Sequence, residues 1–420
     1  MPAGAPNGTV GLKRLLETWR TPVGRGYILL AAMSAAFGLA YYGNQAILTN
    51  YFQNVLHLKG PMFGYITAIR EVPGFFLIFL TALFYRVSQQ RLTACALIAL
   101  GVGLGGFALA SSFWSVIPWV IVSSMGFHTV LQTQYSLGMN LTEESRSGRV
   151  LGRMAAIVQG GALLGTAIIL FVFLFGLSSF HPVFLVLGGV SVLGAIAIVG
   201  FPHLSQGKPG RAQLPPRRLV FKRDYRYYYL LNALDGARQQ LFFSFGLWVL
   251  VNRFRLSVAS ICVVLLGAAL VSMASSPWAG RMIDRYGERR MLSLINLAYI
   301  VALGGYALAN NVLLACLFYV IYSFITPLSP IGAATYLRKV AVPEDIAPSL
   351  AMGVTLLHAT AIVVPVLAGV ILNFVGYQIP FFIACGFACV GAFVTLRLDP
   401  SAQRCAARVA LDASASRGAQ

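Results

Sequence analysis

The amino-acid sequence predicts an all-α membrane protein with twelve transmembrane helices, and three observations support this fold class. Hydrophobic residues make up 58% of the 420 residues and charged residues only 10%, and the mean hydropathy is +0.76. Twelve apolar segments each have about the 20 residues that a helix needs to cross about 30 Å of hydrocarbon. Lys and Arg are concentrated in every second connection between these segments. Together these observations argue strongly against a soluble fold.

The apolar segments follow one another along the whole chain, with short polar connections between them. They cover residues 27–49, 62–85, 92–110, 115–138, 151–176, 181–201, 227–251, 257–279, 291–309, 312–336, 347–375 and 378–396. The first segment is too long for the apolar core of a signal peptide, so we expect it to remain as a helix.

The distribution of Lys and Arg predicts how these helices are oriented. If the N-terminus is cytoplasmic, most of the 31 cations lie in cytoplasmic connections or tails, and the outward loops hold only Lys59, Arg253 and Arg255. This bias predicts that both termini are cytoplasmic. The expected location is the cytoplasmic (inner) membrane of a bacterium. The net charge of +19 then reflects topology and contact with anionic lipid, and no nucleic-acid partner is expected.

The longest polar interruption divides the segments into two groups of six. It is rich in Pro, Gly and cations, which favours a linker. The expected organisation is a cytoplasmic tail at 1–26, a six-helix bundle at 27–202, a cytoplasmic linker at 203–226, a six-helix bundle at 227–397 and a cytoplasmic tail at 398–420.

Small residues and prolines predict local features of the helices. Two pairs of glycines four residues apart favour close packing of helix backbones in lipid. These pairs are Gly101 with Gly105 and Gly161 with Gly165. Pro327 and Pro330 in the tenth segment, and Pro365 in the eleventh, remove backbone donors and predict bends.

The connection between the eighth and ninth segments carries the most specific motif. Residues 280–290 read GRMIDRYGERR. Gly287 suits a tight turn, Gly280 allows a helix to approach closely, and Asp284 can accept hydrogen bonds from Arg or face a helix N-terminus. The alternative interpretation is a basic loop that only fixes topology.

This motif resembles the cytoplasmic loop signature of the major facilitator superfamily, G-x-x-x-D-R-x-G-x-R-R, at every defined position. The resemblance implies a gating loop formed by Gly280, Asp284, Arg285, Gly287, Arg289 and Arg290. The connection between the second and third segments keeps Arg86 and Arg91 of this signature, but has Tyr85 in place of Asp. The second copy would therefore carry most of the gating. The fifth segment lacks the Gly-Pro pair of the family's drug antiporters, which lowers the expectation of drug efflux.

The resemblance covers residues 27–396 and implies two six-helix bundles around a central cavity, with alternating access by rocking of the two halves. The family places the first, fourth, seventh and tenth segments around the cavity. Polar and aromatic side chains at helical spacing on these segments are the candidate cavity residues. They are Ser34, Gly38, Tyr41 and Gln45; His128, Gln132 and Tyr135; Asn232, Asp235, Arg238 and Gln239; and Tyr319, Tyr322, Thr326 and Ser329.

Single aromatic or histidine residues of this kind are more often packing residues. This applies to each tyrosine, to His128, and to His358 in the eleventh segment. The prediction of a cavity therefore depends on the agreement between the four segments.

Only two acidic residues, Glu71 and Asp235, lie well within apolar segments. A charge in hydrocarbon is costly, so each is expected to face the protein interior, find a partner or take up a proton. Both are candidates for proton coupling. Asp235 can instead form a fixed ion pair with Arg238 at i, i+3, and Glu71 can form a packing ion pair with Arg153 or another cation. Arg70 points about 100° away from Glu71.

The function predicted from these features is secondary active transport of a small organic solute by alternating access, with Asp235 or Glu71 as the proton-responsive group. The excess of intramembrane Arg over acidic residues leans towards an anionic or zwitterionic solute. The alternatives are an uncoupled facilitator, a drug efflux pump and, in a different class, a membrane sensor or scaffold that does not transport.

An enzyme is not expected, because the sequence lacks a nucleophile with its base, a cluster of metal ligands and a phosphate-binding loop. Cys385 and Cys389 lie about one helical turn apart without a second pair, and we interpret them as packing thiols. We therefore expect no metal and no cofactor. The expected partners are the small-molecule solute and the lipid bilayer, and the expected oligomeric state is a monomer.

Overall fold

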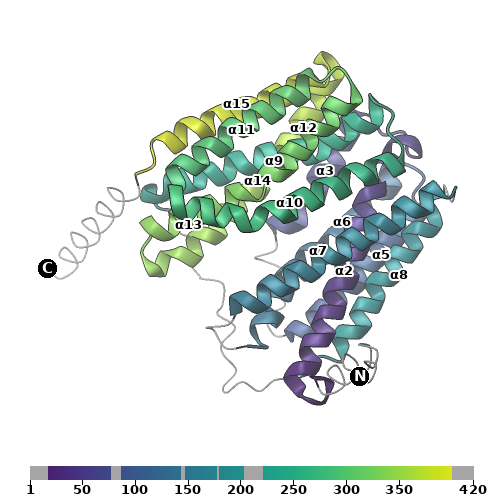
Figure 1. Ribbon diagram of the computed structural model, residues 1–420. Helices are drawn as coiled ribbons and strands as arrows, with labels where there is room; N and C mark the ends of the chain where they lie inside the picture. The colour runs from purple at the N-terminus through teal and green to yellow at the C-terminus, as the bar shows by residue number, and fades with distance from the viewer. Residues whose placement is uncertain (1–17, 77–86, 143–146, 177–178, 203–220, 400–420) are drawn as a thin grey trace, which may run out of the picture. The chain divides into compact units, whose positions relative to one another are not determined.

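A computed structural model of the chain describes residues 18–76, 87–142, 147–176, 179–202 and 221–399 (Figure 1). Within these ranges the side chains of 147–149, 275–280, 284, 343 and 347 are not described. The described residues are almost entirely helical, and there is no strand among them. The all-α fold class is thereby confirmed.

Each of the twelve predicted segments falls on a helix, although only the first part of the second segment is described. The helices are α2 (Pro22–Asn54), α3 (Gly60–Phe75), α5 (Gln89–Gly106), α6 (Phe113–Met139), α7 (Ser147–Leu174), α8 (Phe180–Val199), α9 (Arg226–Asn252), α10 (Val258–Tyr286), α11 (Glu288–Leu308), α12 (Val312–Ile325), α13 (Leu328–Val340), α14 (Pro343–Val375) and α15 (Gln378–Leu396). Two short 3₁₀ turns, η1 (Phe107–Leu109) and η3 (Arg223–Tyr225), adjoin α5 and α9. Nine helical segments in the described part are long and apolar enough to cross a membrane.

The chain divides into two compact units. The first contains the described residues within 1–47 and 77–213, and the second those within 48–76 and 214–420. The second unit therefore includes the end of α2 and all of α3, in addition to the helices after the linker. This grouping differs from the division at the linker, because α3 packs closely on α14.

Glycines hold the helices of the first unit in close contact. A Cβ atom at Gly161 of α7 would lie 2.4 Å from the Ala35 carbonyl oxygen of α2, and one at Gly101 of α5 would lie 2.6 Å from the Gly188 carbonyl oxygen of α8. Both distances are shorter than real Cβ contacts, so no larger side chain fits without movement. The close packing predicted from the glycine spacing is confirmed at Gly161, Gly165 and Gly101, whereas a Cβ atom at Gly105 would meet only Leu185 at 3.9 Å.

The second unit is organised around α14, which packs against both α3 and α9. A Cβ atom at Gly64 of α3 would lie 2.3 Å from the Pro365 carbonyl oxygen, and one at Gly236 of α9 would lie 2.4 Å from the Leu357 carbonyl oxygen. The remaining helices of the unit complete the packing, with α11 against α12 and α15, and α15 against α9.

The tenth predicted segment is interrupted at its proline, as expected. The helix α12 ends at Ile325, and α13 begins at Leu328 after the turn that contains Pro327. Pro365, in contrast, lies inside the continuous helix α14. Proline removes one backbone donor, and a helix accommodates this loss either by a break or within a continuous run.

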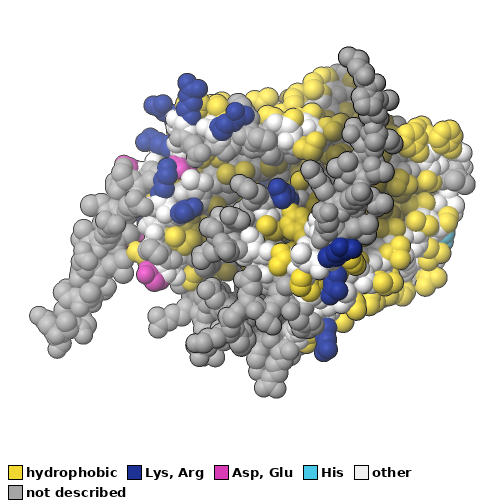
Figure 2. All heavy atoms as spheres, turned by 60° about the horizontal axis from the view of Figure 1, so that its bottom comes forward, with side chains coloured by type: hydrophobic (Ala, Val, Ile, Leu, Met, Phe, Trp, Pro, Cys, Tyr) yellow, Lys and Arg dark blue, Asp and Glu magenta, His cyan; other side chains and the backbone are white. Residues whose placement is uncertain are grey.

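The surfaces of the helices are apolar where a lipid-facing protein requires it. On α8, Val186, Leu193, Ile196 and Val199 are each more than 60% exposed. Figure 2 shows apolar side chains over much of the visible surface, with Lys and Arg in separate groups. Such a large apolar surface is rare on soluble proteins, whereas it is expected on helices that face hydrocarbon.

The cations of the second unit gather at one end of its helices. The Lys339 Nζ atom lies 2.7 Å from Glu288 Oε1, which joins the end of α13 to the start of α11. The Ser293 and Thr395 hydroxyl oxygens are 2.9 Å apart and join the start of α11 to the end of α15. At this end lie Lys222, Arg223, Arg226, Arg285, Arg289, Arg290, Arg338, Lys339 and Arg397.

The opposite end of the second unit is marked by different contacts. The Arg253 guanidinium lies 4.8 Å from the centroid of the Tyr377 ring, and the Tyr377 hydroxyl donates to the Ala309 carbonyl oxygen. Arg253 and Arg255, which the sequence places in an outward loop, are at this end. The described cations of the second unit are thus distributed unequally between its two ends.

Candidate functional site

The polar face of α9 is the first part of the candidate site. Asp235 and Arg238 project from the same side of this helix because they are three residues apart, and the Arg238 Nη2 atom donates to Asp235 Oδ1. The ion pair proposed from the spacing is therefore confirmed. The Asp235 side chain is 14% exposed and that of Arg238 is 2% exposed.

Two residues of α11 also contact Arg238. Its Nη1 atom donates to Asn296 Oδ1 over 3.2 Å, and its guanidinium carbon lies 3.5 Å from the centroid of the Tyr299 ring. Asn296 is itself fixed, because its Nδ2 atom donates to the Leu292 carbonyl oxygen one turn earlier in α11. A buried cation thus meets a carboxylate, an amide oxygen and an aromatic face, which together offset the cost of its burial.

The tenth segment supplies a second partner for Asp235. The Ser329 Oγ atom of α13 donates to Asp235 Oδ2 over 2.5 Å. Both carboxylate oxygens therefore accept a hydrogen bond, one from Arg238 on the same helix and one from across the interface with α13. Ser329 lies just beyond the break at Pro327, so a movement of α13 relative to α12 would change this contact.

The tyrosines of α12 pack in an aromatic cluster. Tyr322 stacks on Phe242 of α9 with 3.7 Å between ring centroids, and Tyr319 stacks on the same ring at 5.3 Å. Tyr319, Tyr322 and Thr326 are 2%, 0% and 9% exposed. These three residues lie in the packed interior of the second unit, and their contact with a solute remains a prediction.

The other two predicted residues of α9, Asn232 and Gln239, do not contact the Asp235–Arg238 pair in any of the described hydrogen bonds. The Asn232 Nδ2 atom donates to the Tyr228 carbonyl oxygen of its own helix. Gln239 is half-buried. The neighbouring Gln240, which the helical spacing did not select, makes the longer-range contact described below.

In the first unit, two of the predicted residues of α2 are in contact. The Gln45 Nε2 atom donates to the Tyr41 hydroxyl over 2.8 Å, and the Tyr41 ring stacks on Phe127 of α6 with centroids 3.8 Å apart. Ser34 is buried and meets the sulfur of Met154, so it belongs to the packing between α2 and α7. Gly38 has the same role, because a Cβ atom there would lie 2.2 Å from the Val158 carbonyl oxygen.

The three predicted residues of α6 differ in their exposure. His128 is buried, with 6% of its surface exposed, and its ring lies 5.0 Å from that of Phe127. Gln132 and Tyr135 are exposed. The structure joins α2 and α6 through Tyr41 and Phe127, an aromatic residue that the polar spacing overlooked.

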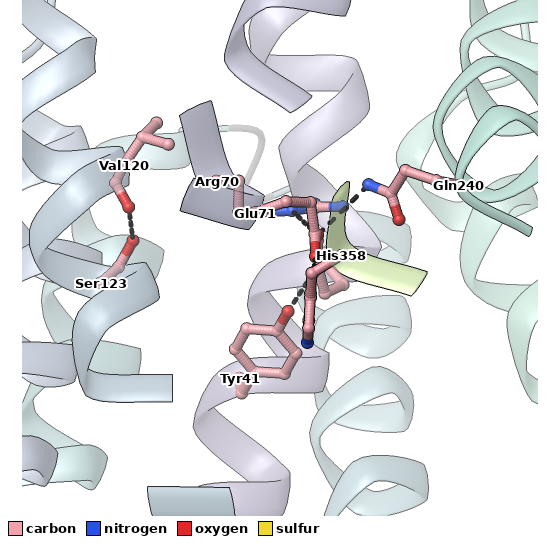
Figure 3. Close-up of polar contacts among 8 residues, drawn as sticks. Tyr41, Arg70, Glu71, Val120, Ser123, Gln240 and His358 are labelled. Atoms are coloured by element: carbon pink, nitrogen blue, oxygen red, sulfur yellow. Dashed lines mark hydrogen bonds and ion pairs between the residues drawn. The ribbon is translucent and has the colours of Figure 1, made fainter. Parts of the chain in front are cut away.

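Glu71 is the centre of a second polar cluster, formed by three helices of the second unit (Figure 3). Its Oε2 atom lies 3.2 Å from His358 Nδ1 on α14, and its Oε1 atom accepts from Gln240 Nε2 on α9 over 3.2 Å. The Arg70 Nε atom lies 3.6 Å from the same Oε1. The expectation that Glu71 finds a partner is confirmed, and that partner includes the histidine of the eleventh segment.

The predicted gating loop forms the turn between α10 and α11. Gly287 has φ of +79°, a conformation that favours glycine and explains its place in the motif. Arg285, Arg289 and Arg290 are exposed. The predicted roles of Gly280 and Asp284 lie outside what the structure describes, because the surroundings of these two residues are not described. Glu288, a variable position of the motif, is 3% exposed and pairs with Lys339.

A further contact, at the same end of the second unit as the Gly287 turn, joins the residues just before α9 to the start of α14. Asp345, in the first turn of α14, accepts from Lys222 Nζ over 2.5 Å and from the Tyr225 hydroxyl over 2.8 Å. Burial raises the pKa of the Tyr225 phenol, and its hydrogen bond to Asp345 raises it further. Tyr225 therefore remains a proton donor at physiological pH.

Sequence and structure comparisons connect this arrangement to known proteins. The model of the Major Facilitator Superfamily matches residues 228–411. The fold is similar to that of the nucleoside transporter NupG, with a TM-score of 0.74 and 13% identity over 88% of this chain and 98% of that chain. It is also similar to a bacterial homolog of the human lysosomal transporter Spinster in an inward-facing, unoccupied conformation, with a TM-score of 0.70 and 13% identity over 92% and 98%. No curated protein matches the chain.

Proposed function

We propose that the chain, which matches the Major Facilitator Superfamily over residues 228–411, is a proton-coupled secondary transporter of this superfamily that moves a small organic solute by alternating access. The observation that carries this proposal is the fold, which the chain shares over most of its length with solved transporters of this type. At such low identity, these relatives support the transport mechanism and leave the chemical identity of the solute open.

The buried polar groups support transport of a polar solute. Asp235 is held between Arg238 and Ser329 with its side chain 14% exposed, and Tyr41 with Gln45 forms a polar and aromatic pair on α2. We propose that these residues, with His128, Gln132, Tyr135, Asn232, Gln239, Tyr319, Tyr322 and Thr326, contact the solute at some stage of the cycle.

The charge of the solute is less clearly indicated than the composition suggests. Arg238 is bound to Asp235 and Asn296, and Arg70 faces Glu71. Arg residues that already face a carboxylate supply less positive potential for an anion. We therefore propose a polar small organic solute and do not infer a negative charge on it from the number of Arg residues.

The proposed orientation follows from the cations. We propose that the end of the second unit with the Gly287 turn faces the cytoplasm, that both termini lie on this side, and that the protein is a monomer in the bacterial inner membrane. The residues of the Gly280–Arg290 motif would then act at the cytoplasmic face.

The experiment has two stages. The purified protein is first screened for thermal stabilisation by a metabolite and drug library, because a ligand that binds only the folded state raises its melting temperature. Uptake of the identified solute is then measured in proteoliposomes with and without a pH gradient. We expect accumulation above equilibrium only with the gradient, and slower accumulation in Asp235→Asn and Glu71→Gln.

Equilibration without accumulation would instead identify an uncoupled facilitator, and the coupled mechanism would be wrong. Glu344→Gln is the matched control, because it makes the same chemical change at an exposed carboxylate in the first turn of α14. Accumulation at the unsubstituted rate in both Asp235→Asn and Glu71→Gln would exclude Asp235 and Glu71 as coupling groups.

A further inference from the structure

We propose that Glu71 and His358 together form the proton-binding site of the transporter, and that their charge state controls the contact between α3 and α14. The inference rests on the transport function proposed above and assigns its coupling group. The two residues are 287 positions apart in sequence and meet through Glu71 Oε2 and His358 Nδ1, 3.2 Å apart.

The geometry favours this pair over Asp235 as the site of proton exchange. Both oxygens of Asp235 accept hydrogen bonds, and one of these partners is a buried guanidinium, which cannot give up its proton. A proton on Asp235 would leave Arg238 buried without its counter-ion. Glu71 instead faces a histidine, whose charge changes readily between about pH 5 and 8.

The described partners of the pair within the helices of the second unit include one cation and one neutral amide. On α3 the adjacent Arg70 lies 3.6 Å from Glu71 Oε1. The helix α14 contributes His358, and α9 contributes the neutral Gln240. The charged residues of α9, Asp235 and Arg238, are paired with each other. Among these four residue types, histidine is the one that ordinarily changes charge between about pH 5 and 8.

The helix contact around the pair is close enough to respond to its charge. The backbones of α3 and α14 meet at two further places, because a Cβ atom at Gly64 would lie 2.3 Å from the Pro365 carbonyl oxygen and one at Gly369 would lie 2.7 Å from the Gly60 carbonyl oxygen. At these two places the backbones meet without an intervening side chain. With Glu71 ionised and His358 protonated, the pair holds the helices together; the loss of either charge weakens this bond.

Disulfide formation between α3 and α14 measures this contact without any solute. A Cβ atom at Gly60 would lie 3.3 Å from Leu372 Cβ, which is close to the usual separation in a disulfide. The variant Gly60→Cys with Leu372→Cys is made in a background that lacks the six native cysteines. The control pair is Ala36→Cys with Gly194→Cys, which joins α2 to α8 in the first unit at a Cβ separation of 3.1 Å.

The measured quantity is the rate of disulfide formation of the α3–α14 pair divided by that of the control pair, between pH 5 and 9. Division by the control removes the common effect of pH on thiol reactivity. If the pair carries the proton, we expect the ratio to fall about tenfold from pH 5 to pH 9, because a charge-assisted hydrogen bond is replaced by a neutral one.

Substitutions identify the titrating group. We expect His358→Gln, which can still donate to Glu71, and Glu71→Gln to give a ratio that does not change with pH. Gln240→Leu removes a hydrogen bond from the same carboxylate and is expected to keep the pH dependence. A ratio that is independent of pH in the unsubstituted background, or that keeps its pH dependence in both Glu71→Gln and His358→Gln, would overturn the proposal. A failure to transport any solute would not change these rates and would contradict the transport proposal alone.

Discussion

The guanidinium of Arg238 lies 3.5 Å from the centroid of the Tyr299 ring, with its edge bound to Asp235 and Asn296. This arrangement buries a positive charge inside the second unit and supplies a carboxylate, an amide oxygen and an aromatic face in place of water. The side chain of Arg238 therefore links α9 to Asn296 and Tyr299 of α11.

The first prediction concerns the ion pair itself. Asp235→Asn leaves Arg238 buried without a counter-ion and is expected to destabilise the protein by about 3–5 kcal/mol, as is typical when one partner of a buried pair is removed. Arg238→Gln in addition should recover part of this loss. The melting temperatures of the two single variants and the double variant form a mutant cycle, and strictly additive effects would contradict the predicted coupling.

The second prediction concerns Asn296, which tertiary structure alone connects to Arg238. Asn296→Leu removes the acceptor of a charged donor and is expected to cost about 1–3 kcal/mol in stability. Asn310→Ala is a suitable control because Asn310 is exposed at the start of α12. Equal melting temperatures for the Asn296 variant and the unsubstituted protein would show that the contact does not stabilise the fold.

The third prediction uses two adjacent glycines of α7. A Cβ atom at Gly161 would lie 2.4 Å from the Ala35 carbonyl oxygen, whereas one at Gly160 would meet nothing within 4 Å. Gly161→Ala is therefore expected to lower the melting temperature by several degrees. Gly160→Ala should leave it unchanged or raise it slightly, because alanine favours the helix by about 1 kcal/mol. If the order of the two variants is reversed, the packing of α7 on α2 is wrong.

The fourth prediction is a pH dependence at the start of α9. Because the pKa of Tyr225 is raised in the folded state, the folded protein binds this proton more tightly than the unfolded chain does. Its contribution is therefore complete below the ordinary tyrosine pKa of about 10 and is lost as the pH rises above it. Tyr225→Phe is expected to lower stability at pH 8 by about 1 kcal/mol and to lose less stability than the unsubstituted protein between pH 9 and 11. Unfolding curves at these pH values test both statements.

The fifth prediction tests the orientation. Single cysteines at Lys59 and Arg289, in the background without native cysteines, should react with a membrane-impermeant thiol reagent from opposite sides of the membrane. We expect Arg289→Cys to be labelled only in inverted vesicles and Lys59→Cys only in intact cells. Labelling of both positions from the same side would refute the predicted topology.

Much of this molecule could be predicted from local patterns. The lengths of the apolar segments predicted each described helix, the glycine spacing predicted the contacts of Gly161 and Gly165, and the i, i+3 spacing predicted the pair of Asp235 with Arg238. These features depend on residues within one helix, or on the absence of a side chain, so they are visible without knowledge of the neighbouring helices.

The contacts between distant segments could not be predicted in the same way. Gln240 was overlooked in favour of Gln239, and His358 was interpreted as a packing residue, because a helical wheel does not show which face meets which helix. Asn296 and Tyr299 belong to the ninth segment, which the family resemblance does not place at the cavity, and so no signal marked them.

The sequence by itself therefore determined that this protein lies in a membrane, the order of its described helices and the end of the second unit that carries its cations, because hydrocarbon imposes its requirements on every residue separately. Only the tertiary structure decided that Glu71 meets His358 and that Arg238 meets Asn296. The physical reason is that a buried charge selects its partner by distance in space, and helices far apart in the chain come within that distance only after they pack.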